Sequence, residues 1–158
     1  MYKAVEAPEL FARQLGIKAG FLVEVINAPP EFVAGLEQGM PPGARVADSQ
    51  IASASSKLMV CWPRDMSDLM SIVMRRLKNA TIPLNALWAV IPKKPVAERR
   101  GSDLFFQAVL DHVLPTGLVD NKSLTFSEEE YGIRFVPRRA KNVGAQGLAP
   151  LPKEEGSV

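Results

Sequence analysis

The chain has 158 residues, of which 47% are hydrophobic and 23% are charged, and this mixture is typical of one ordinary globular domain. Its formal net charge is only +2, from 19 Lys and Arg against 17 Asp and Glu, so charge alone does not indicate a nucleic-acid-binding protein. One Cys and one His exclude an internal disulfide framework, a Cys/His zinc cluster and any two-histidine site.

The sequence also argues against a membrane or secreted protein. No apolar run approaches the ~20 residues that cross a bilayer, and no long apolar stretch follows the first residues, as it would in a secretory signal. We therefore expect a protein of the reduced cytoplasm. We also expect it to have no metal and no cofactor.

The first half of the chain alternates between helical and strand-like segments. A helix is predicted from Pro8 to Leu15, because its apolar residues share one side and Gly16 can end it. The apolar run from Phe21 to Asn27 predicts a strand that is covered on both faces. A second helix is predicted from Pro30 to Gln38, and a short strand from Ala44 to Asp48.

The middle of the chain continues this alternation. Continuous apolar runs predict strands from Leu58 to Trp62 and from Ala86 to Ile91, and helical spacing predicts a helix from Ser67 to Asn79 between them. A polar loop is expected from Pro92 to Gly101. It leads to a helix from Ser102 to Leu114, with Ser102 as its N-cap.

Two further strands are predicted near the end, from Leu118 to Phe126 and from Tyr131 to Pro137. The acidic turn from Ser127 to Glu130 joins them, which indicates an antiparallel pair. We expect a single domain over residues 1–139. The remainder, residues 140–158, lacks periodicity and is rich in Gly, Pro and charged residues, so we expect a disordered tail.

This order of elements predicts an α/β fold with three layers. Strands that alternate with helices of about a dozen residues form right-handed parallel units, with helices on both faces of the sheet. The closing hairpin adds an antiparallel edge to a mainly parallel, doubly wound sheet. The arrangement resembles the class I methyltransferase variant of the Rossmann fold, and this likeness of fold implies no function by itself.

Three phrases of the sequence are more specific than its pattern. They extend over Leu15–Phe32, Ala86–Lys94 and Gly117–Arg139, and include the WxxxPKK-like stretch from Trp88 and the GLVDxK stretch. Together they resemble a bacterial family known as domain of unknown function three-thousand-and-fifty-two. The resemblance implies a methyltransferase-like sheet and supplies no established activity.

The loop after the first predicted strand is the most informative for function. In an open α/β sheet, ligands bind beyond the carboxyl ends of the strands, and a nucleotide or S-adenosylmethionine site usually needs glycines there. Here the loop is Asn27-Ala28-Pro29-Pro30-Glu31. The prolines remove two backbone donors and Glu31 adds negative charge at the helix start, so we predict that the loop repels phosphate.

Basic residues follow the predicted strands Leu58–Trp62 and Ala86–Ile91. Arg64 comes shortly after the first of these strands, which ends at Trp62, and Lys93 and Lys94 come shortly after the second. If these strands are adjacent and parallel, the cations converge on an anion such as a carboxylate or phosphate, while Trp62 offers an apolar wall. The alternative is a solvated basic edge above an interior tryptophan. With Asn27, these residues are candidate ligand-binding residues.

Three other residues have both a chemical and a structural interpretation. Asp120 and Lys122 are two apart in a predicted strand, so they should point the same way and form either an ion pair or a lysine base with a tuned pKa. Glu24 lies in an apolar strand, where an unpaired carboxylate is costly. It faces the sheet edge, pairs with a basic residue or has a raised pKa, and pairing is favoured.

The sequence thus favours a non-catalytic, degenerate methyltransferase-like domain that acts as a binding or accessory module, with a protein partner or a small ligand. The alternative is an enzyme or sensor that binds a small anionic metabolite or nucleotide at the carboxyl edge of the sheet. A nucleic-acid role ranks last, because the basic pairs are not interleaved with aromatic residues. The oligomeric state is left open.

Overall fold

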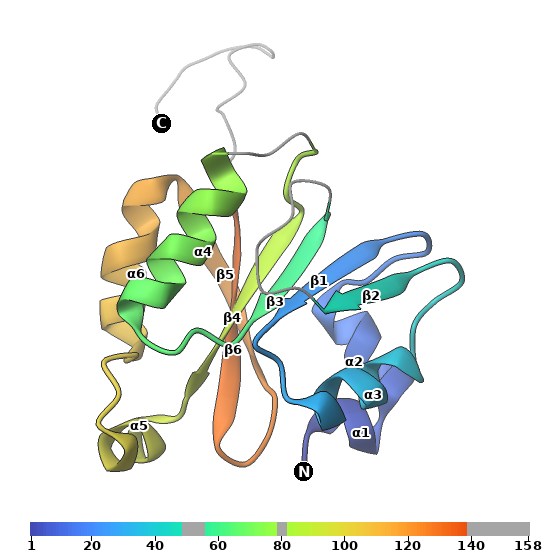
Figure 1. The fold of residues 1–158 in the computed structure, drawn as a ribbon, viewed down its shortest axis with the longest axis horizontal. Coiled ribbons are helices and arrows are strands. Elements are labelled where there is room, and N and C mark those ends of the chain that lie inside the picture. The colour runs from blue at the N-terminus through green and yellow to red at the C-terminus, as the bar shows by residue number, and fades with distance from the viewer. Residues whose placement is uncertain (49–55, 79–81, 139–158) are drawn as a thin grey trace.

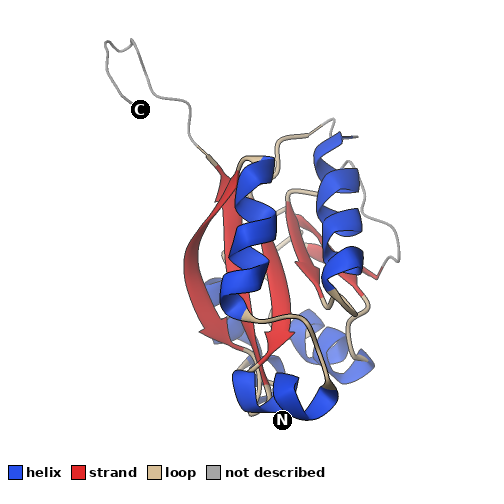
Figure 2. Cartoon of the chain, turned by 90° about the vertical axis from the view of Figure 1, so that its left-hand side faces the viewer, coloured by secondary structure: helices blue, strands red, loops and turns tan. Residues whose placement is uncertain are grey.

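The computed structural model describes residues 1–48, 56–78 and 82–138, which form one sheet with helices on both of its faces (Figures 1 and 2). The six strands have the order β2-β1-β3-β4-β6-β5. The pairs β1/β2, β1/β3 and β3/β4 are parallel, and β4/β6 and β5/β6 are antiparallel. The predicted three-layer α/β fold with a closing hairpin is confirmed.

The elements up to residue 48 are α1 (Lys3–Glu6), α2 (Pro8–Leu15), β1 (Leu22–Ile26), α3 (Pro30–Glu37) and β2 (Arg45–Asp48). They are followed by β3 (Leu58–Cys61), α4 (Met66–Lys78), β4 (Ala86–Pro92), α5 (Lys94–Arg100), α6 (Phe106–Val113), the 3-10 turn η1 (Leu114–Thr116), β5 (Leu118–Thr125) and β6 (Glu130–Pro137). No helix in the described ranges is long and apolar enough to cross a membrane.

The strand order reverses between β1 and β3. From β1 the chain adds β2 on one side, and it then returns to place β3 and β4 on the other side. Such a reversal is the topological switch point, where ligands of open α/β sheets bind in the crevice beyond the carboxyl ends of the strands. The fold therefore draws attention to the residues that follow β1 and β3.

Each face of the sheet has its own core. On one face α4 and α6 cover the sheet, with Leu69, Val73 and Val109 fully buried. On the other face α1, α2 and α3 cover a cluster that includes Phe11 and Phe32. Alternate residues of β3 and β4 enter the two cores, which explains why these strands are apolar throughout.

The structure corrects two of the predicted elements. The expected polar loop from Pro92 to Gly101 contains the helix α5, which buries Val96 and Ala97. The next helix, α6, begins at Phe106, so Ser102 is not its N-cap. The Ser102 hydroxyl instead accepts a hydrogen bond from the backbone N–H of Leu104, 3.0 Å away. The predicted tail of residues 140–158 lies outside the described residues.

Candidate functional site

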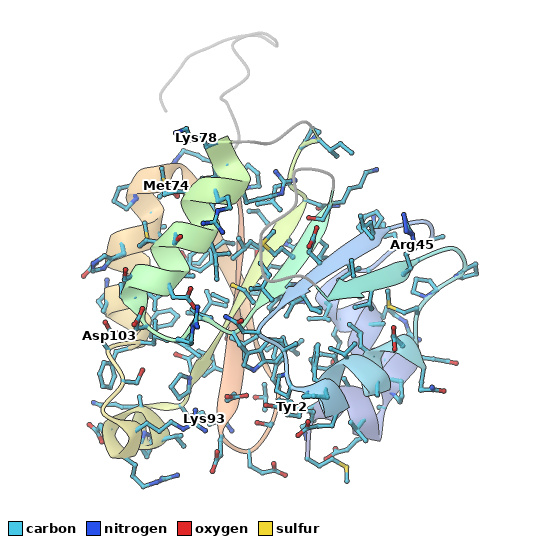
Figure 3. All side chains as sticks on the ribbon, viewed as in Figure 1. Tyr2, Arg45, Met74, Lys78, Lys93 and Asp103 are labelled. Carbon is cyan, nitrogen blue, oxygen red and sulfur yellow. The ribbon has the colours of Figure 1, made fainter. Side chains whose placement is uncertain are left out.

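The carboxyl edge of the sheet gathers loops from distant parts of the sequence. The ends of β1, β3 and β4 meet there with the start of α1 and with the turn between β5 and β6. The backbone N–H of Lys3 donates to the carbonyl of Phe126 over 2.8 Å, and that of Lys93 donates to the carbonyl of Glu129 over 2.8 Å. Figure 3 shows Tyr2 and Lys93 at this end of the molecule and Lys78 at the other.

Asn27 closes the crevice between β1 and β3. It adopts a left-handed conformation, with φ 59°, which asparagine tolerates better than most non-glycine residues. Its side-chain amide donates to the carbonyl of Trp62 over 3.3 Å and to Asp68 Oδ2 over 3.5 Å. A hydrogen bond from Asn27, which follows β1, to Trp62, which follows β3, thus bridges the crevice.

The helix that follows this loop offers few donors. Pro29 occupies the N-cap position of α3 and Pro30 its first turn, and neither has a backbone N–H. No side chain caps the helix, and Glu31 lies in its first turn. The N-terminus of α3 therefore has fewer of the backbone N–H donors with which such helices bind anions in nucleotide-binding proteins.

Aromatic rings pack beyond the ends of β1 and β3. We call Tyr2, Phe32, Trp62 and Phe126 the aromatic cluster. The ring centroids of Phe32 and Trp62 are 4.7 Å apart, and that of Tyr2 is 5.8 Å from Phe32 and 6.3 Å from Trp62. Phe126 stacks on Phe32 at 5.6 Å. Trp62 is only 8% exposed, so it is an interior residue with one edge near solvent.

Glu130, at the start of β6, joins three elements at this edge. Its Oε1 accepts hydrogen bonds from the Tyr2 hydroxyl, at 2.7 Å, and from the Trp62 indole N–H, at 3.1 Å. Its Oε2 lies 3.6 Å from Nη1 of Arg100 in α5. Burial raises the pKa of the Tyr2 hydroxyl above its usual value, and the hydrogen bond and charge of Glu130 raise it further.

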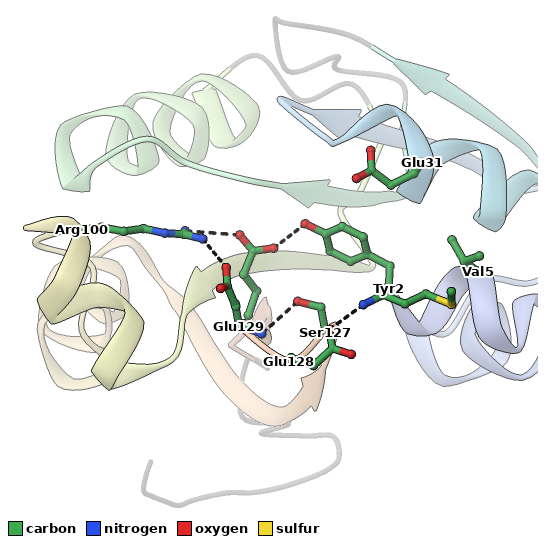
Figure 4. A pocket seen from close by; sticks show the side chains of 9 residues that line it. Tyr2, Val5, Glu31, Arg100, Ser127, Glu128 and Glu129 are labelled. Carbon is green, nitrogen blue, oxygen red and sulfur yellow. Dashed lines mark hydrogen bonds and ion pairs between the residues drawn. The ribbon is translucent and has the colours of Figure 1, made fainter.

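Two cavities flank Glu130 and Arg100, and together we call them the carboxyl-edge cleft. One, of about 440 Å³, is shown in Figure 4 and is lined by Met1, Tyr2, Val5, Glu31, Arg100, Ser127, Glu128, Glu129 and Glu130. The other, of about 470 Å³, is lined by Trp62, Pro63, Arg64, Asp65, Val90, Pro92, Arg100, Gly101, Ser102, Asp103, Leu104 and Glu130. Carboxylates outnumber guanidinium groups in both linings.

The predicted basic residues do not meet in one place. Arg64 lines the larger cavity, but its side chain is 78% exposed and its Nε lies 3.4 Å from Asp68 Oδ2. Arg100, which the sequence did not single out, is the second guanidinium of that cavity. Lys94 lines a separate cavity with Phe106. Lys93 lines neither that cavity nor the larger cavity of the cleft. Trp62 lines the larger cavity of the cleft.

The sequence predicted that Asp120 and Lys122 point the same way, but in the structure they point to opposite sides of the sheet. A β-bulge between them pairs Asp120 with Phe135 and Lys122 with Arg134. Consecutive residues of β6 face opposite sides of the sheet, so their partners do too. Lys122 Nζ donates to the carbonyl of Gln14 over 3.2 Å and lies 5.8 Å from the centroid of the Trp88 ring, away from the cleft.

Three residues of the site, Tyr2, Arg100 and Glu130, were not recognised in the sequence as site residues. Glu130 was assigned only to the acidic turn, and Arg100 only to one of the basic pairs considered for the nucleic-acid role. Their contacts cross 128 residues from Tyr2 to Glu130 and 68 from Trp62 to Glu130, so no local pattern indicates them.

Several solved structures of methyltransferases are similar to this chain. An S-adenosylmethionine-dependent methyltransferase from Aquifex aeolicus matches with a TM-score of 0.54 and 10% identity, over 84% of this chain and 90% of that chain. Magnesium protoporphyrin IX methyltransferase from Synechocystis with bound S-adenosylhomocysteine matches with a TM-score of 0.52 and 9% identity, over 85% and 82%. The mitomycin 7-O-methyltransferase MmcR matches with a TM-score of 0.59 and 13% identity, over 85% and 53%.

These likenesses show the fold: the chain has a methyltransferase-like Rossmann fold. Identities this low carry no statement about activity. No family model matches the chain, and no curated protein matches it. The resemblance to domain of unknown function three-thousand-and-fifty-two therefore stays a prediction.

Proposed function

We propose that this chain is a non-catalytic, degenerate methyltransferase-like domain, which works without a nucleoside cofactor as a binding or accessory module. The observation that carries the proposal is the closed switch point. The hydrogen bond from Asn27 to Trp62 and the aromatic cluster occupy the crevice where proteins of open α/β folds bind their ligands.

A nucleoside could enter this crevice only by displacing buried rings. Phe32 is fully buried and Trp62 is 8% exposed. Exposing one such side chain costs about 1.5–3 kcal/mol, and moving Trp62 also breaks its hydrogen bond to Glu130. A ligand would have to recover these losses from its own contacts, and the loop after β1 offers few donors for them.

The charges of the carboxyl-edge cleft suit a cationic or uncharged group better than an anion. Arg100 already pairs with Glu129 at 2.9 Å and with Glu130 at 3.6 Å. An anion in the larger cavity would also meet Asp65 and Asp103. The alternative function, binding of a small anionic metabolite or nucleotide at this edge, therefore requires Arg100 to exchange two carboxylates for the ligand.

Thermal unfolding with candidate ligands tests the proposal. The full chain is heated alone and with S-adenosylmethionine, S-adenosylhomocysteine, nucleotides and phosphosugars at millimolar concentration. A ligand at 100 times its Kd adds about 2.7 kcal/mol of stability, which would raise Tm by roughly 5–10 °C in a chain of this size. We expect no rise with either adenosyl compound, and a rise with one of them would refute the proposal.

A matched pair of variants separates the two functions. If an anion raises Tm, the rise should disappear in Arg100→Gln and persist in Arg99→Gln, because Arg100 lines both cavities of the cleft and Arg99 lines neither. Such a result would establish the anion-binding alternative. Isothermal titration of the unmodified chain with the same compounds checks that the melting temperatures report binding.

A further inference from the structure

The strand β5 forms one edge of the sheet, and one of its sides is open. It comes last in the strand order, and within residues 1–48, 56–78 and 82–138 it pairs with β6 alone. Its residues from Asp120 to Ser123, and also Thr125, are exposed. An edge strand presents a row of backbone N–H and C=O groups without strand partners, and such a row can pair with a strand of another chain.

The register of the hairpin shows which backbone groups of β5 point outward. The N–H of Phe126 donates to the carbonyl of Glu130 over 3.0 Å, so Phe126 bonds toward β6. Hydrogen-bonded and non-hydrogen-bonded pairs alternate in an antiparallel ladder. Leu124 therefore also bonds toward β6, whereas Ser123 and Thr125 direct their N–H and C=O groups outward.

An apolar groove accompanies this open part of the edge, and we call it the α2–β5 groove. It has a volume of about 360 Å³ and lies between residues 123–125 of β5 and the helices α1 and α2. Leu10 of α2 lines it with a side chain that is 47% exposed. Leu124 packs against the core under α2 and is only partly buried. A strand added to this edge would thus cover apolar side chains as well as backbone groups.

The sequence Ser123-Leu124-Thr125 can pair with a second copy of itself. A two-fold axis through Leu124 places Ser123 of each copy opposite Thr125 of the other. Each such pair exchanges both of its outward hydrogen bonds, and its two hydroxyl side chains are neighbours. The Leu124 side chains meet at the axis, in a non-hydrogen-bonded pair, where side chains are closest. We propose that two copies of this chain associate in this way, antiparallel along β5.

Charges on the α2 face of the sheet are complementary in this arrangement. Lys122 lies on that face, where its Nζ is 3.2 Å from the carbonyl of Gln14. In the pairing, Lys122 lies opposite Phe126 of the second copy, whose carbonyl accepts the N–H of Lys3 at the start of α1. Glu6 of α1 pairs with Lys3, lines the α2–β5 groove and has a side chain that is 41% exposed. Lys122 of each copy can therefore share the Glu6 carboxylate of the other copy with Lys3.

This contact surface is separate from the carboxyl-edge cleft. The two-fold axis reverses the strand direction, so the clefts of the two copies open at opposite ends of the joined sheet. The association therefore goes beyond the proposed function and does not depend on what the cleft binds.

Sedimentation equilibrium of the full chain measures the association. Between about 5 and 500 µM, a range that covers weak interfaces, we expect the mass to rise from 17.2 kDa toward twice that value. Ser123→Pro should remain a monomer throughout, because it removes an outward N–H and spares the hydrogen bonds to β6. Its matched control, Ser123→Ala, keeps that N–H and should associate as the unmodified chain does. Circular dichroism checks that both variants are folded.

Charge reversal tests the register without touching the backbone. Lys122→Glu or Glu6→Lys alone should raise the Kd of association by about threefold to tenfold, because both symmetric contacts become repulsive. An equimolar mixture of these two variants should regain the original Kd, since each contact between unlike variants again joins opposite charges. The control Lys18→Glu makes the same change of charge at an exposed residue that does not line the groove, and it should leave the Kd unchanged.

Amide hydrogen exchange locates the contact. The amides of Ser123 and Thr125 should exchange rapidly in dilute solution and slowly in concentrated solution, whereas the Leu124 amide should be protected in both. The association is refuted if the chain stays a monomer at every concentration, if folded Ser123→Pro associates as well as Ser123→Ala, or if mixing the charge variants restores nothing. Protection of the Ser123 and Thr125 amides in the monomer would show that another segment of the same chain covers the edge, and would also overturn the association.

Discussion

Arg76 of α4 offers the sharpest test of how this fold is held together. Its side chain is 1% exposed, and its Nη2 donates to the carbonyls of Ser56 and Ile82 over 2.7 and 2.8 Å. These carbonyls precede β3 and β4, so one guanidinium ties together the starts of two central strands. Burial lowers the pKa of Arg76, and the charge of the buried Glu24 acts in the opposite direction. Among the described residues, the basic group that interacts with Glu24 is thus Arg76, which acts through its charge without forming a close ion pair.

The Arg76→Met substitution should cost about 3–5 kcal/mol. Each hydrogen bond that a charged group donates contributes about 1.5–3 kcal/mol. Methionine keeps most of the apolar stem but loses both hydrogen bonds, and it leaves Glu24 without its compensating charge. For a chain of this size the loss corresponds to a fall in Tm of roughly 6–20 °C.

Equilibrium unfolding in urea measures this loss. The matched control is Arg75→Met, because Arg75 is the exposed neighbour on the same helix, and its change should stay within about 0.5 kcal/mol. Glu24→Gln should destabilise the unmodified chain but stabilise the Arg76→Met chain, since it removes the uncompensated charge. The reasoning fails if Arg76→Met loses less than about 1 kcal/mol, or if Glu24→Gln has the same effect in both backgrounds.

Three further predictions concern single groups. Burial raises the pKa of the Cys61 thiol to about 12, so at pH 8 it should react with a disulfide reagent only when the chain unfolds, and prompt reaction of the native chain would contradict its burial. Burial also raises the pKa of Tyr2 and Tyr131, so the stability they contribute should be complete below the unfolded value near pH 10 and should fall as the pH rises above it. Unfolding in urea at pH 9 and 11 checks this, and Tyr2→Phe should reduce the fall. Gly132→Ala would place a Cβ 2.5 Å from the Phe126 ring, so it should cost about 1–3 kcal/mol in urea unfolding, and an unchanged midpoint would argue against this packing.

Most of the fold could be predicted because its strands are either apolar throughout or joined by a short turn. The runs that contain β1, β3 and β4 are buried on both faces, and this situation leaves a continuous apolar signature. The helix α5 was missed because it has only seven residues, contains Pro95 and ends in charged residues, so it resembles a polar loop. The late start of α6 was missed because a serine can close a local turn as well as cap a helix.

The candidate site was less predictable than the fold, for a physical reason. The residues next to the strand ends, Asn27, Trp62 and Arg64, could be named because the topology fixes where strands end. What each side chain does there depends on partners that only the tertiary structure supplies. Glu130 accepts a hydrogen bond from Trp62, and Asp68 pairs with Arg64. Each of these side chains therefore has its own partner, and the expected convergence of cations on one site is not seen.

The pairing of buried polar groups adds an argument for the proposed loss of cofactor binding. A site that awaits a ligand usually keeps donors or acceptors that only the ligand can satisfy. At the carboxyl edge, the Asn27 amide, the Trp62 indole N–H and the Tyr2 hydroxyl all have partners within the chain. Within the described ranges, the buried side-chain atoms without a hydrogen-bond partner are Nε and Nη1 of Arg76, at the opposite end of the sheet. Because the polar groups at the switch point already satisfy one another, a nucleoside would have to break existing hydrogen bonds there before it could form its own.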